Sequence, residues 1–401
     1  MKNIRLEGIK MVESCSNCLY DIKHPFGLSL SQNKCTGCIT HEEKYQIDWS
    51  KKEEELKSLL EKYKKRSKVY DCVVPVVGDA EDYYVLSKVL ELGMSPLVVS
   101  VNDYFKNDIG WHNLHHLITY FDVDSIVYNP DIRVYKELVR TSLRKYDHIL
   151  LPFLQLYTSF PVHIAKERKI PLIIWGQNQS VEQVGKFSHH DKVQMSEWSR
   201  KEHDLFGNDI DTLIGNGAQV QERDLNYYQY PKISDLEKSG VKGIYLSNYM
   251  KWDPLKQNHS TLEFGFKPQE NSSSFDIYER AGSSVYYQLH DLLKYKRIGY
   301  RKVRDHLTRE IRHGRIDKKQ AQEVESSYNK NKVDVSGFFN WLGMTQSAQE
   351  WFIMHKLNGL EHLIGKSDSS DIKLSNKINE KLVCGEKERE NFIVFGKGIS
   401  I

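Results

Sequence analysis

The stretch Val69-Tyr-Asp-Cys-Val-Val-Pro-Val-Val-Gly-Asp-Ala-Glu-Asp82 decides the fold. Its apolar run leads into a glycine turn and then a polar segment, which is typical of a buried strand followed by a tight loop and a helix. Comparable apolar runs recur at 96–101, 125–129, 148–153 and 171–176, with helical patterns between them. Strands joined by helices pair in parallel, because each crossover must hold a helix. The sequence therefore predicts a doubly wound α/β domain with a parallel sheet.

Four cysteines precede this domain in two close pairs. Two residues lie between Cys15 and Cys18, two lie between Cys35 and Cys38, and 16 residues separate the pairs. Four thiolates satisfy tetrahedral Zn²⁺ and leave no open coordination position, so we expect a structural zinc site. The alternative interpretation is a pair of redox motifs.

The chain is expected to have five parts. Leu56, Leu59, Leu60 and Tyr63 recur at helical spacing, which indicates a connecting helix with one packed side. Strand patterns fade beyond about residue 205 and helical patterns replace them. We predict a zinc-binding module at 1–45, a connecting helix at 46–67, the α/β domain at 68–235, a helical C-terminal region at 236–365 and a tail at 366–401.

Charge and hydropathy exclude some classes of protein. The 401 residues carry 57 Lys+Arg and 54 Asp+Glu, a formal net charge of +3, which gives no general attraction to a nucleic-acid backbone. The apolar runs are far shorter than the ~20 residues that span a bilayer. We therefore expect a cytoplasmic protein of ordinary globular composition.

The loop after the first strand carries three carboxylates. Gly78 and the start of the next helix would aim backbone amides at an anion, as in many phosphate sites. Asp79, Glu81 and Asp82 would repel a bare phosphate unless Mg²⁺ or basic residues intervene. Alternatively, Asp79 caps the helix and Asp82 favours its positive end.

Two further groups are candidates for ligand binding. Gly176, Gln177 and Asn178 end the run at 171–176, and their amides suit an adenine, a sugar hydroxyl or an acetamido group. The alternative for these amides is local capping of the loop. A basic stretch that includes Lys296 and Arg301 could supply positive charge to an anionic ligand, although a solvated helix face is the usual explanation.

The ordered motifs resemble the N-acetyl sugar amidotransferase family of bacterial surface-polysaccharide and pseudaminic or legionaminic acid biosynthesis. The resemblance begins with the cysteine pairs, Tyr45-Gln-Ile-Asp-Trp49 and Tyr70-Asp-Cys-Val-Val-Pro-Val-Val-Gly78, and covers roughly residues 15 to 355. It continues through Ile109-Gly-Trp-His-Asn-Leu114, Ile170-Pro-Leu-Ile-Ile-Trp-Gly-Gln-Asn178, Tyr249-Met-Lys-Trp-Asp-Pro254 and His290 to Arg301.

The resemblance implies a PP-loop, HUP-like fold and an ATP- and Mg²⁺-dependent enzyme that converts a sugar N-acetyl group into an acetamidino group. The substrate would be a sugar or nucleotide sugar, and a separate glutaminase subunit would supply ammonia. Asp79, Glu81 and Asp82 would be catalytic. The residues that would bind the cofactor are Gly78, Asn113, Gly176, Gln177, Asn178, Lys296 and Arg301.

The phosphate loop departs from the family pattern. Family members carry Ser-Gly-Gly-x-Asp-Ser, whereas this chain has Val77-Gly-Asp-Ala-Glu-Asp82. In the family pattern, the serine hydroxyl and the second glycine let the loop approach pyrophosphate. Both are missing here, and this departure puts ATP cleavage in question. Two alternatives remain open: a tRNA thiolation enzyme, and a non-catalytic member that binds a sugar or a partner.

Overall fold

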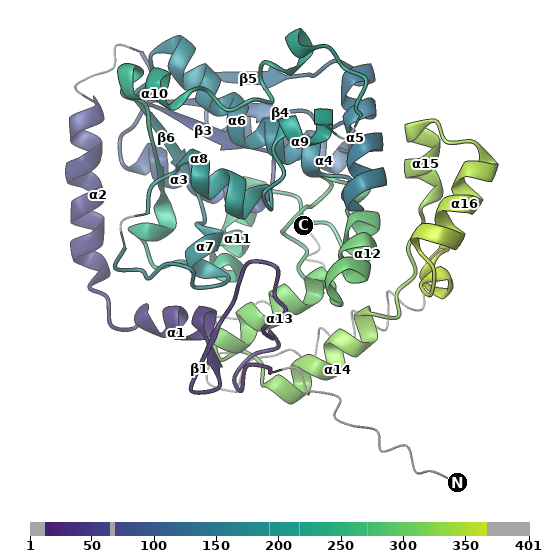
Figure 1. Cartoon of the computed structure of the whole chain (residues 1–401). Helices are drawn as coiled ribbons and strands as arrows, with labels where there is room; N and C mark the ends of the chain where they lie inside the picture. The colour runs from purple at the N-terminus through teal and green to yellow at the C-terminus, as the bar shows by residue number, and fades with distance from the viewer. Residues whose placement is uncertain (1–12, 65–68, 192, 216, 271, 367–401) are drawn as a thin grey trace.

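The computed structural model describes residues 13–64, 69–191, 193–215, 217–270 and 272–366 (Figure 1). Residues 1–12 of the predicted zinc module lie outside these ranges, as does the predicted tail from residue 367 onward.

A parallel sheet of five strands forms the centre of the α/β domain. The strands are β3 (Cys72–Val76), β4 (Pro96–Val101), β5 (Ser125–Tyr128), β6 (Leu172–Trp175) and β7 (Lys242–Tyr245). Their order is β5-β4-β3-β6-β7, and every neighbouring pair is parallel. The chain moves outward from β3 to β5 and then returns to place β6 on the other side of β3. This reversal is the topological switch point, where doubly wound sheets form a ligand crevice.

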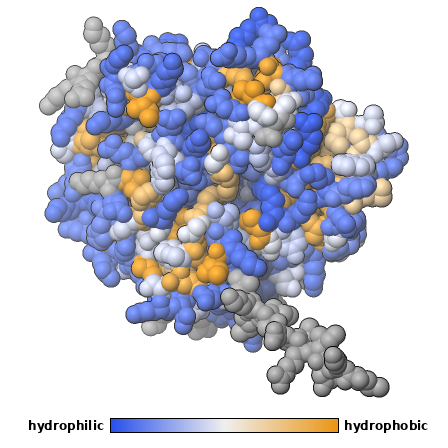
Figure 2. All heavy atoms as spheres, in the orientation of Figure 1, coloured by the Kyte–Doolittle hydropathy of each residue, from blue (hydrophilic) through white to orange (hydrophobic). Residues whose placement is uncertain are grey.

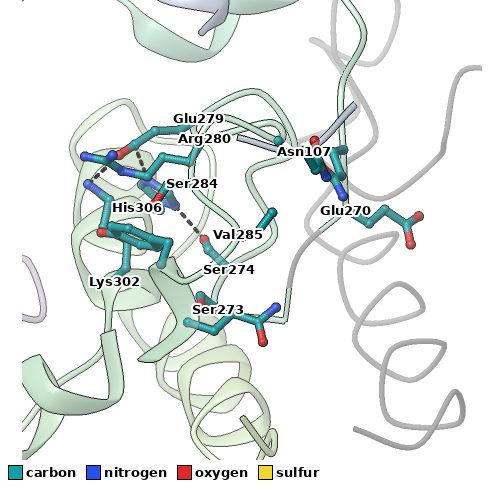
Figure 3. A pocket seen from close by; sticks show the side chains of 14 residues that line it. Asn107, Glu270, Ser273, Ser274, Glu279, Arg280, Ser284, Val285, Lys302 and His306 are labelled. Atoms are coloured by element: carbon teal, nitrogen blue, oxygen red, sulfur yellow. Dashed lines mark hydrogen bonds and ion pairs between the residues drawn. The ribbon is translucent and has the colours of Figure 1, made fainter. Parts of the chain in front are cut away.

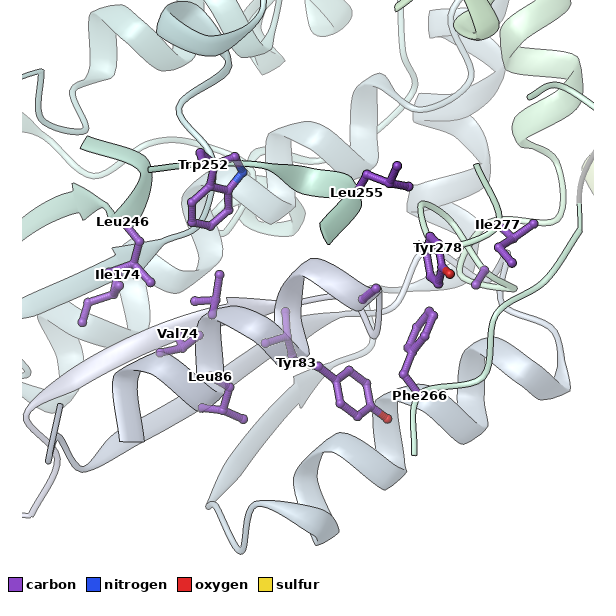
Figure 4. Packing of buried hydrophobic residues seen from close by; sticks show 14 of the residues in the cluster. Val74, Tyr83, Leu86, Ile174, Leu246, Trp252, Leu255, Phe266, Ile277 and Tyr278 are labelled. Atoms are coloured by element: carbon purple, nitrogen blue, oxygen red, sulfur yellow. The ribbon is translucent and has the colours of Figure 1, made fainter. Parts of the chain in front are cut away.

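Alternate residues of the strands pack against helices on opposite faces. Val74 belongs to one buried cluster with Leu86 and Leu255, whereas Val73 belongs to another with Leu138 and Leu156. Figure 4 shows the first cluster. The first face is covered by α3 (Ala80–Glu91), α4 (Asp108–Tyr120) and α11 (Pro254–Ser260), and the second by α5 (Ile132–Tyr146) and α6 (Leu151–Arg168). Helices on both faces confirm the predicted doubly wound architecture.

The strand expected at 148–153 is wrong, because this apolar run enters α6. Pro152 occupies the first turn of the helix, where a missing N–H costs nothing. Since α6 packs against the sheet and against α5, much of its surface is buried, and it lacks the one-sided stripe of a surface helix. A short apolar run does not distinguish a buried strand from a buried helix by periodicity alone.

The fifth strand is instead β7, which the sequence did not reveal. Gly243 lies within it, and a Cβ there would stand 2.6 Å from Cβ of Met195. The Met195 amide donates to the Gly243 carbonyl at 3.0 Å, so this edge strand needs a glycine although glycine weakens the strand signal. The sheet therefore extends past the predicted boundary at residue 235.

The remaining helices lie before and after the sheet. The N-terminal segment contains the hairpin β1 (Leu30–Ser31) and β2 (Lys34–Cys35), α1 (Thr36–Glu43) and α2 (Trp49–Lys64). Short helices α7 (Gln179–Glu182), α8 (Glu197–Ser199), α9 (Ile210–Gly215) and α10 (Ile233–Ser239) follow β6. The C-terminal region consists of α12 (Tyr287–Ile298), α13 (Lys302–Arg312), α14 (Lys318–Tyr328), α15 (Ser336–Leu342) and α16 (Gln346–Lys356).

The surface is mostly hydrophilic on the face shown in Figure 2, where apolar side chains form separate patches. Within the residues that the structure describes, no helix has the length and apolar character needed to cross a membrane.

Candidate functional site

A cavity of about 610 Å³ opens at the carboxyl edge of the sheet. The loops after β3 and β6 form one part of its wall, as expected at a switch point. Asp79, Glu81 and Asp82 line it from the first loop, which we call the acidic loop (residues 77–82). Gly176, Gln177 and Asn178 line it from the second loop. The structure thus brings together the two groups of residues that the sequence singled out at the strand ends.

Glu81 connects these two loops. Its Oε1 accepts a hydrogen bond from the Gln177 amide at 2.8 Å. A Cβ at position 176 would lie 2.1 Å from the same oxygen, so Gly176 allows the carboxylate to reach across. The absence of a side chain at Gly176 therefore allows the Glu81 carboxylate to lie against the backbone of the second loop.

The anion-binding position of the acidic loop is filled by the chain itself. Oδ2 of Asp82 accepts hydrogen bonds from the amides of Val77 and Gly78 at 2.8 Å and from that of Asp79 at 2.9 Å. We call these three amides the anion nest. Gly78 adopts φ = +96°, which points the amides inward, and Asp79 is the N-cap residue of α3. The helix-start interpretation of Asp82 is therefore correct, and its carboxylate stands where a phosphate would have to bind.

Burial changes the protonation of these carboxyls. It raises the pKa of Glu81 to about 8, although the Gln177 amide opposes the shift. Burial and the neighbouring Asp79 raise the pKa of Asp82 to about 7, against the pull of the three amides. Burial also raises the pKa of Asp79, while Arg280 lowers it. Near neutral pH the cavity therefore offers a protonated carboxyl, Glu81, which is suited to donating a proton.

The opposite part of the cavity comes from the C-terminal region. Lys294 and Arg297, from the basic stretch that the sequence singled out, line the cavity, but sequence reasoning missed the four residues that follow. Arg280, Lys302, His306 and Arg309 line this part, which we call the C-terminal wall. Arg280 follows a serine-rich segment with no periodic pattern, and Lys302 to Arg309 read as one face of an ordinary charged helix. No local signal could reveal that these residues face strands about 200 positions earlier in the chain.

A chain of polar contacts orders the C-terminal wall (Figure 3). Lys302 Nζ lies 2.8 Å from Glu279 Oε1, and His306 Nε2 lies 2.6 Å from Glu279 Oε2. The other ring nitrogen of His306 is 2.5 Å from Ser274 Oγ. Burial opposes ionisation of Glu279, but Lys302 and His306 hold the pKa of its carboxyl well below its ordinary value. Glu279 is therefore ionised and fixes the orientation of the histidine ring.

In the Asn178 side chain, the amide oxygen has hydrogen-bond partners and the amide nitrogen has none among the described residues. Its Oδ1 accepts from the amide of Ser180 at 3.2 Å and from the Ser180 hydroxyl at 2.6 Å, so it caps α7. Its buried Nδ2 has no hydrogen-bond partner among the described residues. Asn178 therefore combines loop capping with a donor that is available to a ligand in the cavity.

Asn113, Lys296 and Arg301 do not line the cavity, in contrast to the role that the resemblance implies. Asn113 bonds both main-chain groups of Lys267, each at 2.9 Å, and so ties α4 to a distant loop. Lys296 pairs with Asp147 at 2.8 Å on the surface. Arg301 is buried and donates to the carbonyls of Tyr328 and Asn331. All three hold elements together in this structure.

The four paired cysteines converge on one point. All four Sγ atoms lie within 4.8 Å of one another and are buried, with Cys15 to Cys38 at 3.9 Å and Cys18 to Cys35 at 3.6 Å. Sγ of Cys15 accepts from the amides of Cys18 and Cys35, as in metal-binding knuckles. Because both pairs form a single cluster, the interpretation as separate redox motifs is not favoured. The donor set fits a tetrahedral metal ion with no open position.

This cysteine cluster is joined to the cavity through Arg312. The guanidinium donates to Cys35 Sγ at 3.6 Å and to the carbonyl of Gln183, next to α7, at 2.7 Å. A Cβ at Gly37 would lie 2.2 Å from Nη2 of Arg312, so the knuckle needs glycine for this approach. Thr36 also donates to the Val184 carbonyl at 2.7 Å. The cysteine module therefore supports the segment that carries Asn178.

The fold and site define a doubly wound α/β protein with a ligand-sized cavity and a metal-binding cysteine module. Residues 270–367 match the family model described as the C-terminal domain of WbpG-like lipopolysaccharide biosynthesis proteins. This match fits the resemblance drawn from the sequence motifs, and it covers the segment that forms the C-terminal wall.

Among solved structures, the chain is similar to an NH3-dependent NAD synthetase from Campylobacter jejuni subsp. jejuni, solved in complex with the nitrate ion. The two share 12% identity with a TM-score of 0.27, over 56% of this chain and 99% of that chain. The fold assignment therefore stands on the strand order of this chain. No curated protein matches the chain.

Proposed function

We propose that this protein is an amidotransferase-like enzyme of surface-polysaccharide biosynthesis that converts a sugar N-acetyl group into an acetamidino group. The observation that carries the proposal is the cavity itself. Its acidic loop comes from the α/β domain, and its C-terminal wall comes from the segment that matches the polysaccharide-biosynthesis family. A sugar that carries both an acetamido group and an anionic group meets complementary chemistry at these two walls.

The reaction exchanges the amide oxygen for NH, so the chain must help the oxygen to leave. Glu81, protonated near neutral pH, is placed to donate a proton to that oxygen. The free Nδ2 of Asn178 is available to orient the acetamido group. We further propose that ammonia comes from a separate glutaminase subunit and that the cysteine cluster holds structural zinc.

The acidic loop does not fit a nucleotide phosphate, because the Asp82 carboxylate occupies the anion nest. We therefore assign no ATP-dependent step to this loop. An unactivated amide is a poor electrophile, so the assay below includes ATP with Mg²⁺ as one arm and omits it in the other.

Mass spectrometry tests the proposed function. The protein is incubated with ammonia and candidate acetamido sugars, free or nucleotide-linked, and the products are searched for replacement of oxygen by NH. We expect conversion by the wild type and loss of conversion in Glu81→Gln. Glu91→Gln, at the exposed end of the same helix, is the matched control. Conversion that persists in Glu81→Gln would contradict the assigned proton donor.

The filled anion nest also favours a second candidate, a sugar-binding protein without this chemistry. In that case calorimetry would detect binding of the sugar by the wild type, and no product would form with or without ATP, Mg²⁺ and the glutaminase partner. Binding without turnover under all these conditions would contradict the enzyme proposal and support the sugar-binding protein.

A further inference from the structure

Among the cations lining the large cavity, Arg280 stands apart because it donates no hydrogen bond to any described residue. Lys302 pairs with Glu279, Arg309 lies 2.8 Å from Asp276, and Lys294 pairs with Asp305. Arg200 pairs with Asp209, and Arg312 donates to main-chain carbonyls. Within the described part of the chain, Arg280 forms no hydrogen bond or ion pair, and its Nε is buried.

The position of Arg280 is fixed in other ways. Its guanidinium lies 4.6 Å from the centre of the Tyr287 ring, a cation–π contact that holds the group flat without using its hydrogen-bond donors. Its backbone adopts φ = +59°, a left-handed conformation that is uncommon for residues other than glycine. Strained backbone of this kind is enriched at ligand sites.

A smaller pocket of about 140 Å³ adjoins Arg280 and is large enough for a compact oxyanion. Ser284 lines it, and the buried Oγ of this serine also lacks a hydrogen-bond partner among the described residues. Two carboxylates line the pocket as well: Glu279 is paired with Lys302 at 2.8 Å, and Glu270 is exposed to solvent. Figure 3 shows Arg280 and Ser284 near Glu279, with Glu270 on the other side of the view.

The acidic loop cannot take the charge of an anionic ligand, since its three amides already hold the Asp82 carboxylate. Burial opposes the charge of the Arg280 guanidinium, but the ring of Tyr287 and the carboxylates of Asp79 and Glu279 raise its pKa. Because no described group accepts a hydrogen bond from it, its donors are available to an anionic ligand. We propose that Arg280 and Ser284 form an oxyanion subsite in the smaller pocket, which shares Arg280 with the large cavity and binds a phosphate or carboxylate group of the ligand. This inference rests on the proposed function only in taking the cavity as the ligand site.

Calorimetry tests the subsite without requiring turnover. Inorganic pyrophosphate and N-acetylneuraminic acid serve as probes, one for phosphate and one for carboxylate. We expect wild-type protein to bind at least one probe and Arg280→Gln to bind it at least about tenfold more weakly, as for loss of a charge-assisted hydrogen bond. Arg280→Lys should restore part of the affinity. Arg223→Gln is the control, since that side chain is exposed.

Asp82→Ser separates the two possible anion sites. We expect this variant to keep the wild-type affinity, and any added site in the nest should be insensitive to Arg280→Gln. The proposal is overturned if neither probe binds the wild type, or if Arg280→Gln binds as tightly as the wild type while its melting temperature is unchanged. Because only binding is measured, a failed amidotransferase assay would leave this result unaffected.

Discussion

At the scale of single residues, the acidic loop shows how similar carboxylates acquire different roles. Asp82 satisfies three amides, Asp79 begins a helix, and Glu81 reaches across to the neighbouring loop. The sequence predicted that these side chains meet at the sheet edge, because strand ends and glycine turns are local signals. It left open which carboxylate would fill the anion nest, since that depends on side-chain direction after folding.

Glu81→Gln should alter the pH dependence of stability. Burial raises the pKa of Glu81 in the folded protein to about 8 from an ordinary value of 4.5. Because the folded-state pKa is raised, this stabilisation is complete below pH 4.5 and is lost as the pH rises toward 8. Melting temperatures measured from pH 5 to pH 9 should therefore show the wild type losing stability relative to Glu81→Gln as the pH rises to about 8. Above that pH, the difference between the two melting temperatures should stay constant. Parallel curves for the two proteins would contradict this result.

The features that single out Arg280 could not be predicted from the sequence. We infer an anion site at Arg280 from three observations: it donates no hydrogen bond to a described residue, it lies over the Tyr287 ring, and its backbone is left-handed. None of these features follows from the neighbouring residues in the sequence. By contrast, the sequence spacing of the paired cysteines predicted a metal site. The four thiols lie together in the structure, as expected for Cys15, Cys18, Cys35 and Cys38.

At the scale of secondary-structure elements, the parallel sheet was predictable and its edge was not. β3, β4, β5 and β6 lie within predicted apolar runs, because buried parallel strands are continuously apolar. β7 is a short edge strand with a glycine, and the run at 148–153 resembles a strand although it enters a buried helix. Packing on the sheet decides both cases, and packing is not a local property.

Gly185→Ala tests how the cysteine module contacts the α/β domain. Gly185 has φ = +61°, and a Cβ there would lie 2.4 Å from the Thr36 carbonyl oxygen. Strain plus this backbone clash should destabilise the fold by about 2–4 kcal/mol, measured by chemical denaturation. Gly207→Ala is the control, because Gly207 has φ = +75° with nothing within 4 Å, and it should lose only about 1 kcal/mol. Equal losses in the two variants would show that the contact with Thr36 contributes nothing.

At the scale of the whole molecule, the cavity depends on segments that are far apart in the sequence. The acidic loop, α7 and α13 meet around it, and Arg312 joins the cysteine cluster to α7. Sequence patterns predicted the α/β domain and the cysteine module separately. They suggested that a basic stretch of the C-terminal region could supply charge to the ligand, and Lys294 and Arg297 of this stretch line the cavity. They could not identify the residues of the C-terminal wall, since long-range packing creates it.

Removal of the metal should loosen this arrangement. We expect purified protein to contain one zinc ion per chain by elemental analysis, and chelation to lower its melting temperature by about 5 °C or more. Cys15→Ser should lose the metal, whereas Cys72→Ser should retain it because Cys72 lies in β3, outside the cluster. Full zinc content in Cys15→Ser would contradict a site made of four cysteines.

The most direct test of the account is a crystal structure of the protein with an anionic acetamido sugar bound. We predict that the acetamido group lies between Glu81 and Asn178, that the anionic group contacts Arg280, and that Asp82 keeps its three amide hydrogen bonds. A sugar bound outside the cavity, or a phosphate seated on the amides of the acidic loop with Asp82 displaced, would contradict it.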